Sequence, residues 1–171
     1  MGFEWRSFLL RPELDEKRDL ETFRRYTQAW NRPAAEDESG EFNVWAGDSG
    51  PPSHSVPPHL VAKAAARVGP DAFERIHIRL LRAFFTHNRD ITDRETLGAI
   101  WRDAGLAEAD LAGADDPALL KEVLGEHRAA LDLGVIGVPA VQLQGREAAI
   151  TGAYPAETYR RWIRRILEER S

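Results

Sequence analysis

The sequence of 171 residues contains no cysteine. This absence excludes disulfide bonds, cysteine-ligated zinc, iron–sulfur clusters and a thiol nucleophile within the chain. Long hydrophobic runs are also missing, since no stretch approaches the roughly 20 apolar residues that a membrane helix needs. The first residues lack the basic region and apolar run of a secretory signal. We therefore expect a cytoplasmic protein with no membrane partner.

An excess of positive charge is missing as well. The formal net charge is −5, which argues against broad, non-specific binding of nucleic acid. The last predicted helix does contain four clustered arginines, and we interpret them as a solvated helix face rather than a polyanion site. No two of the five histidines have the i, i+4 spacing of a helical metal site, so we predict no metal. The arginines of the cluster are Arg160, Arg161, Arg164 and Arg165.

The first third of the chain is poor in regular periodicity. Residues 3–10 mix alternation with a closing apolar run and predict a strand. Residues 19–30 predict a short helix, because Phe23, Tyr26 and Trp30 fall on one face. Residues 31–58 form a long segment rich in proline, glycine and acidic residues. Loops of this length tend to be functional or mobile.

The remainder changes from helical to strand-forming patterns. Residues 59–133 predict consecutive helices, one of which opens at Thr92 and Glu95 with the spacing of a capping box. Val138–Leu143 and residues 147–151 predict two strands of a β-hairpin joined by a short turn. Pro155 opens a final amphipathic helix.

Four stretches together carry a resemblance to a known family. They are Trp5-Arg6-Ser7-Phe8-Leu9-Leu10-Arg11-Pro12, Pro52-Ser53-His54-Ser55 through Ala65, Ala83-Phe84-Phe85 through Asp93, and Gly134 through Pro139 followed by Ile150-Thr151-Gly152-Ala153. This combination resembles the DsbA-like thioredoxin family, in the cytoplasmic branch with FrnE-like proteins and 2-hydroxychromene-2-carboxylate isomerases.

The resemblance implies an α/β fold, in which a thioredoxin-like core carries a large all-helical insertion. Residues 1–30 and 134–171 would form the core, 31–58 the long loop and 59–133 the insertion. The family pattern places a first strand and a first helix, with Cys-x-x-Cys or a serine variant, before Phe3. We expect both elements to be missing from this sequence, so neither a catalytic cysteine nor a catalytic serine is assigned here. Three explanations stay open: the true start lies upstream, a second copy or another protein supplies the strand, or the sheet has rearranged.

The resemblance also implies a substrate-binding segment at Gly137, Val138 and Pro139. In thioredoxin-like folds this proline is cis, and the backbone of the preceding residue pairs with an extended peptide or thiol substrate. From the residues alone, a trans proline that begins a strand is the simpler interpretation. His54 lies in the loop that resembles the one facing this proline, and we expect it either to line a substrate groove or to serve as an ordinary loop residue.

Three functions remain open at this point. The first is a thiol–disulfide oxidoreductase-type protein whose own chain lacks the redox-active motif. The second is a relative of glutathione-dependent isomerases or transferases, and glutathione enters as a cofactor only here. The third is a non-catalytic binding or assembly module that uses the proline groove or the open sheet edges. Its partners would be a thiol or peptide ligand, a second copy, or a strand-donating protein.

Overall fold

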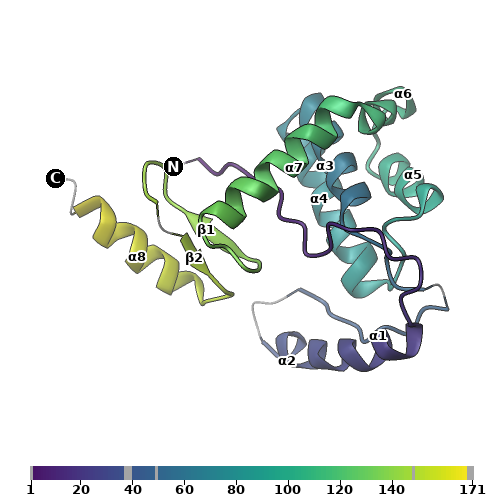
Figure 1. Ribbon diagram of the computed structural model, residues 1–171, viewed down its shortest axis with the longest axis horizontal. Coiled ribbons are helices and arrows are strands. Elements are labelled where there is room, and N and C mark those ends of the chain that lie inside the picture. Colours follow the sequence, from purple (N-terminus) through teal and green to yellow (C-terminus); the bar gives the residue numbers. More distant parts are fainter. Residues whose placement is uncertain (1, 37–39, 49, 148, 169–171) are drawn as a thin grey trace. The chain divides into compact units, whose positions relative to one another are not determined.

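The computed structural model describes residues 2–36, 40–48, 50–147 and 149–168 (Figure 1). The chain divides into two compact units. Unit 1 comprises Met1–Phe8 and Leu124–Ser171, and unit 2 comprises Leu9–Val123. This division reflects how compactly the residues pack against one another. It does not test the expected partition into core, loop and insertion, which stays a prediction. None of the described helices is long and apolar enough to cross a membrane.

Unit 2 is helical. It begins with α1 (Leu20–Thr27), η1 (Gln28–Trp30) and α2 (Asn31–Ala34), and continues after an irregular segment with α3 (Val56–Val68), α4 (Pro70–Leu81), η2 (Arg82–Thr86), α5 (Arg94–Asp103), α6 (Glu108–Leu111), η3 (Ala112–Asp115) and the first half of α7 (Pro117–Asp132). The predicted helical block is thus confirmed.

The main core of unit 2 forms where α3 packs along α4. Helix α3 presents small buried side chains, including Ala64 and Ala65, which allow close helix approach. Ile76 and Trp101 are fully buried in this core. Helix α3 ends at Gly69, and Pro70 begins α4. A glycine followed by a proline is a local signal that ends one helix and allows the next to begin.

A second, aromatic core anchors the irregular segment between α2 and α3. Trp45 is 2% exposed and packs with Phe23 and Trp30, and Phe42 packs against the same cluster. The interaction is reinforced at the π-helix η2, where Asn43 N–H donates to the Phe85 carbonyl at 2.8 Å. The long loop is therefore tied down over part of its length.

Unit 1 contains the hairpin and the last helix. Strand β1 (Ala140–Gln142) pairs antiparallel with β2 (Ala149–Thr151), which confirms the predicted hairpin. Helix α8 (Ala156–Glu168) follows, and its Tyr159 hydroxyl donates to the Gly152 carbonyl at the end of β2. Among the described residues of unit 1, only Ser7 and Val135 are buried.

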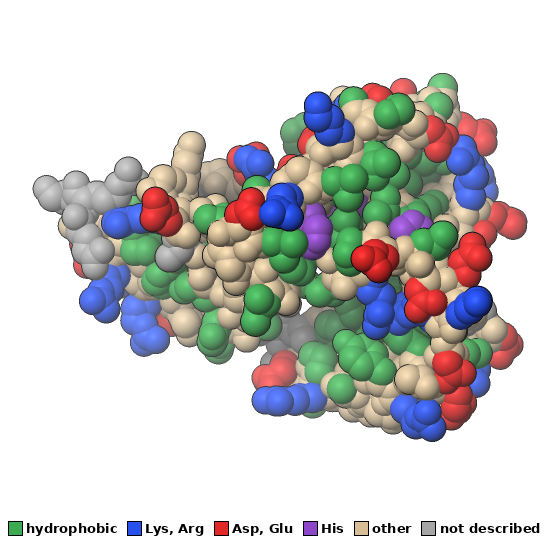
Figure 2. All heavy atoms as spheres, viewed as in Figure 1, with side chains coloured by type: hydrophobic (Ala, Val, Ile, Leu, Met, Phe, Trp, Pro, Cys, Tyr) green, Lys and Arg blue, Asp and Glu red, His purple; other side chains and the backbone are tan. Residues whose placement is uncertain are grey.

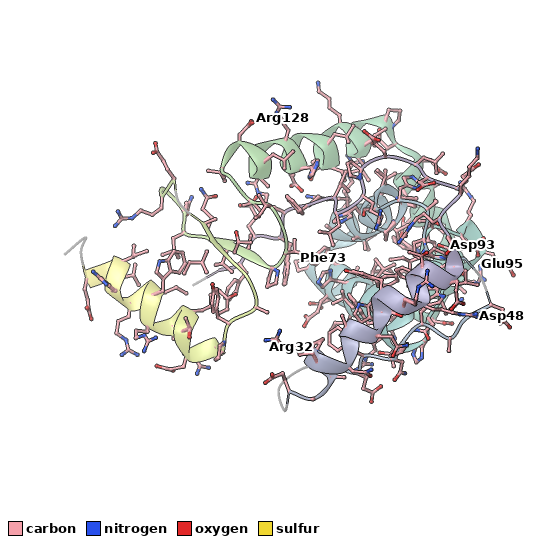
Figure 3. The ribbon with its side chains drawn as sticks, turned by 60° about the horizontal axis from the view of Figure 1, so that its bottom comes forward. Arg32, Asp48, Phe73, Asp93, Glu95 and Arg128 are labelled. Carbon is pink, nitrogen blue, oxygen red and sulfur yellow. The ribbon has the colours of Figure 1, made fainter. Side chains whose placement is uncertain are left out.

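Two local predictions are wrong. Residues 3–10 form no strand, because no described segment pairs with their backbone in a ladder; instead Ser7 N–H donates to Glu126 at 2.6 Å. Helix α5 is capped by Asp93 rather than by Thr92, since the Asp93 carboxylate accepts from Thr96 N–H at 2.8 Å. Asp93 and Glu95 lie at the start of α5 in Figure 3.

Candidate functional site

The segment that leads into β1 is open to solvent. Ile136 is 89% exposed and Val138 is 50% exposed. A side chain built at Gly137 would meet no atom within 4 Å, so the backbone is accessible there. The Val138–Pro139 peptide bond is cis.

The hairpin register fixes which backbone groups of β1 point outward. Val141 faces Ile150, and Pro139 accepts a hydrogen bond from Gly152 N–H at 2.8 Å. In an antiparallel pair, hydrogen-bonded and non-hydrogen-bonded positions alternate. The N–H and C=O groups of Ala140 and Gln142 therefore point away from β2. They form an open edge of the two-stranded sheet that the structure describes.

His54 belongs to unit 2, whereas Gly137, Val138 and Pro139 belong to unit 1. The structure brings the last three together as one continuous segment. His54 is half-buried just before α3, and its Nδ1 lies 3.0 Å from Ser53 Oγ. Each part of the predicted site is therefore described within its own unit.

The surroundings of His54 contain a hydrogen-bonded chain. Ser53 Oγ lies 3.4 Å from Thr92 Oγ1, and Thr92 Oγ1 lies 2.6 Å from Asp90 Oδ1. The same Asp90 oxygen accepts from Thr92 N–H at 2.8 Å. The turn before α5 is thus connected to the loop before α3. Sequence reasoning missed Ser53, Thr92 and Asp90 as members of this group, although an Asp two residues before a Thr is a signal for such a turn.

Arg18 packs beside this group. Its guanidinium donates to the Pro52 carbonyl and lies 4.8 Å from the centre of the Phe23 ring. Burial is the main cause that lowers the pKa of Arg18 from its ordinary value, and the charge of Arg11 lowers it further. Asp15 and Asp90 oppose this shift, so the local field combines two cations with two carboxylates.

Two further titratable residues, His77 and Asp93, take part in packing and in helix capping. His77 stacks on Phe73 with ring centroids 5.3 Å apart, and burial lowers the pKa of its imidazole. Hydrogen bonds from Thr96 lower the pKa of Asp93. A depression of about 280 Å³ is lined by residues of α5 and α6 and by Ala112, none of which is a predicted site residue. Within the described ranges, no group of three or more acidic or histidine side chains could hold a metal ion.

Comparisons with known proteins agree on one fold. The sequence model of one protein family, the DSBA-like thioredoxin domain, matches residues 49–164 of this chain. Cytosolic disulfide reductase DsbM from Pseudomonas aeruginosa superposes with a TM-score of 0.65 at 21% identity, over 89% of this chain and 78% of its own. A Nitrosomonas europaea protein, provisionally described as a protein disulfide isomerase, gives a TM-score of 0.61 at 18% identity, over 69% of this chain and 60% of its own.

The chain spans less than two thirds of the Nitrosomonas europaea protein. No match was found among curated proteins. At these identities the two solved structures establish the fold alone, which is α/β with a thioredoxin-like part and a helical insertion.

Proposed function

Because this chain belongs to the DSBA-like thioredoxin domain family and contains no cysteine, we propose that it binds an extended peptide segment without itself exchanging thiols. The family is one of thiol–disulfide oxidoreductases, and the exchange reaction requires a thiolate nucleophile. The chain would retain the binding of an extended segment, and any redox-active thiol would belong to a ligand or partner.

The outward backbone groups of β1 are the observation that supports this proposal most directly. Ala140 and Gln142 offer N–H and C=O groups at the spacing that an added strand requires. Val138, whose backbone pairs with substrate in the family, lies two residues before Ala140 and is half-exposed. Main-chain pairing would supply affinity with little dependence on the peptide sequence.

The experiment is a titration of the protein with a permanently unfolded, cysteine-alkylated polypeptide, followed by fluorescence anisotropy. Gln142→Pro removes the outward N–H, which the hairpin itself does not use. Gln142→Ala is the matched control, because it removes the side chain and keeps that N–H. We expect Gln142→Pro to weaken binding about fivefold, since one lost hydrogen bond is worth on the order of 1 kcal/mol. Gln142→Ala should bind like the original chain.

Equal affinities for the two Gln142 variants would contradict the proposal. A loss in both variants would indicate recognition through the side chain instead of the backbone. Insulin reduction is a separate readout, and we expect none from this polypeptide alone, because it has no cysteine.

A second candidate function is assembly through a strand supplied by another copy of the chain. Unit 1 favours it, since many of its large apolar side chains are exposed, and Figure 2 shows apolar side chains at the surface of this unit. These side chains are Phe3, Trp5, Leu124, Leu131, Leu133, Ile136, Val138, Tyr154 and Leu167. Exposed apolar surface next to an open strand edge is typical of an interface.

Light scattering during gel filtration separates the two candidates. A dimer that dissociates in Gln142→Pro but persists in Gln142→Ala would support assembly at the β1 edge. A monomer at every concentration, combined with peptide binding, would support the first candidate and exclude the second.

A further inference from the structure

The hydrogen-bonded chain beside His54 has a definite direction. Its members are His54, Ser53, Thr92 and Asp90, all of unit 2, with successive distances of 3.0, 3.4 and 2.6 Å. Three of the four groups have only one proton to donate or none. The direction of every bond in the chain therefore follows from the end that cannot donate.

That end is the carboxylate of Asp90, which only accepts when ionised. Thr92 must give its single hydroxyl proton to Asp90, as the 2.6 Å distance indicates. Thr92 Oγ1 then acts as an acceptor, and both the backbone N–H and the hydroxyl of Ser53 donate to it, each at 3.4 Å. Ser53 Oγ in turn accepts from His54, and the atom that donates is Nδ1–H.

The consequence is a fixed tautomer of neutral His54. Nδ1 carries the proton, and Nε2 carries the lone pair. His54 is half-buried, and toward the described residues Nε2 makes no hydrogen bond. The chain thus holds a proton acceptor in a defined orientation, in the way a carboxylate orients a catalytic histidine.

Arg18 contacts the backbone just before this acceptor. Its guanidinium is hydrogen-bonded to the carbonyl of Pro52, two residues before His54. The backbone N–H of Arg11 donates to Ser55 Oγ, one residue after His54, at 3.0 Å. The segment that carries His54 is thus held from both neighbouring positions, and the positive charge of Arg18 lies on it.

We propose that Nε2 of His54 accepts the proton of a thiol that a ligand brings. The S–H bond breaks, the proton moves to Nε2, and a thiolate and an imidazolium result. The imidazolium keeps its Nδ1–H bond to Ser53, and the chain to Asp90 stabilises its positive charge. The choice of a thiol rests on the proposed function, because the family acts on thiols and this chain has none of its own.

Nitrogen NMR of the histidine side chains tests the tautomer directly, at about pH 8 where an ordinary imidazole is neutral. We expect His54 to have a protonated Nδ1 and an unprotonated Nε2. Ser53→Ala removes the acceptor and should move the proton toward Nε2. A protonated Nε2 in the original chain would overturn the proposal without any variant, so the test does not depend on the folding of Ser53→Ala.

Titration with 2-mercaptoethanol and with its S-methyl ether tests the ligand chemistry. We expect the Nε2 signal of His54 to shift with the thiol and to stay in place with the thioether, which has no S–H. The exposed His87 is the internal control and should respond to neither compound. Equal responses of His54 to both compounds, or no response to either, would overturn the thiol assignment. Peptide binding at β1 is measured separately with the Gln142 variants, so the two failures are distinguishable.

Discussion

A single hydroxyl connects α1 to the buried part of the long loop. Thr27 is fully buried, donates to the Arg24 carbonyl at 2.9 Å and accepts from Trp45 N–H at 3.0 Å. Trp45 lies in the segment 31–58, which the sequence predicts to be a long loop, and nothing in the sequence pattern pointed to Thr27 as its partner. Side-chain contacts between residues 18 positions apart have no periodic signal.

We expect Thr27→Val to destabilise the protein by about 1–3 kcal/mol, because valine keeps the shape but leaves Trp45 N–H without its acceptor in the core. Urea unfolding followed by tryptophan fluorescence measures the effect. Thr22→Val on the exposed side of the same helix is the control and should change stability by less than about 0.5 kcal/mol. Equal losses in both variants would contradict the role of the buried bond.

The cap of α5 gives a pH-dependent prediction at the same scale. Hydrogen bonds from Thr96 lower the pKa of Asp93 in the folded state. A lowered folded pKa adds stability above the unfolded value of about 3.9, and this stability is lost as pH falls through the folded pKa. Asp93→Ala should cost about 1 kcal/mol at pH 7 through loss of the cap.

Asp93→Asn is the control for charge. It keeps an acceptor oxygen for Thr96 N–H and does not titrate, so at pH 7 it should lose only the part of the cap's stability that comes from the carboxylate charge. The stability advantage of the original chain over Asp93→Asn should therefore shrink as pH falls below about 3.9 and through the lowered pKa of Asp93. A constant difference from pH 7 to pH 3 would show that the carboxylate charge is irrelevant to the cap.

At the scale of elements, the distance between two backbone segments decides whether a side chain can be accommodated between them. A Cβ on Gly47 would lie 2.7 Å from the Asn88 carbonyl oxygen, closer than real Cβ atoms come. The contact belongs to the connection between the long loop and the end of η2, where Ala46 N–H donates to Asn88 Oδ1 at 2.9 Å. This connection adds to the aromatic cluster in holding the irregular segment in place.

We expect Gly47→Ala to cost about 1–3 kcal/mol by forcing the two backbones apart. Gly125 in α7 is the matched control, because a Cβ there meets nothing within 4 Å. Gly125→Ala should stabilise the helix by about 0.5–1 kcal/mol. Thermal unfolding followed by circular dichroism compares the two variants, and effects of the same sign would refute the argument.

Helices were more predictable than strands in this chain. Gly69-Pro70 and Asp116-Pro117 are local stop and start signals of the kind that sequence reveals, and α4 and α7 begin at these two prolines. The hairpin was also predictable, because its strands are joined by a short turn. Residues 3–10 have strand-forming residues but no strand, since a ladder also requires a partner that sequence composition does not specify.

The candidate site was predictable only in part. Gly137, Val138 and Pro139 came from a resemblance, and their accessibility could be read only from the structure. The outward direction of the Ala140 and Gln142 backbone depends on the register, which a one-residue slip would invert. The hydrogen-bonded chain at His54 joins positions 53 and 92, and no local pattern relates them.

At the scale of the whole molecule, burial is unevenly distributed between the two units. The described residues of unit 2 contain nearly all of the buried side chains, and those of unit 1 contain Ser7 and Val135. The boundary falls inside α7, where Leu119 and Val123 are buried and the following residues are not. Local stability should follow this distribution.

Hydrogen exchange measured by mass spectrometry tests the expectation. Amides of α3 and α4 should exchange slowest, and amides of β1, β2 and α8 should exchange much faster. Within α7, protection should fall after Val123. Equal protection of α8 and α3 would mean that unit 1 is covered in solution, and addition of the unfolded polypeptide then shows whether the cover is displaced.

The exposed apolar surface of unit 1 has a consequence for the life of the protein in a cell. Chaperones and proteases act on chains that display hydrophobic side chains, and they do so continuously. Chaperones and proteases would recognise a protein with Phe3, Ile136 and Val138 at its surface as incompletely folded until a ligand or partner covers these side chains. Its abundance would then follow the supply of its ligand or partner, and the chain would accumulate only where that partner is present.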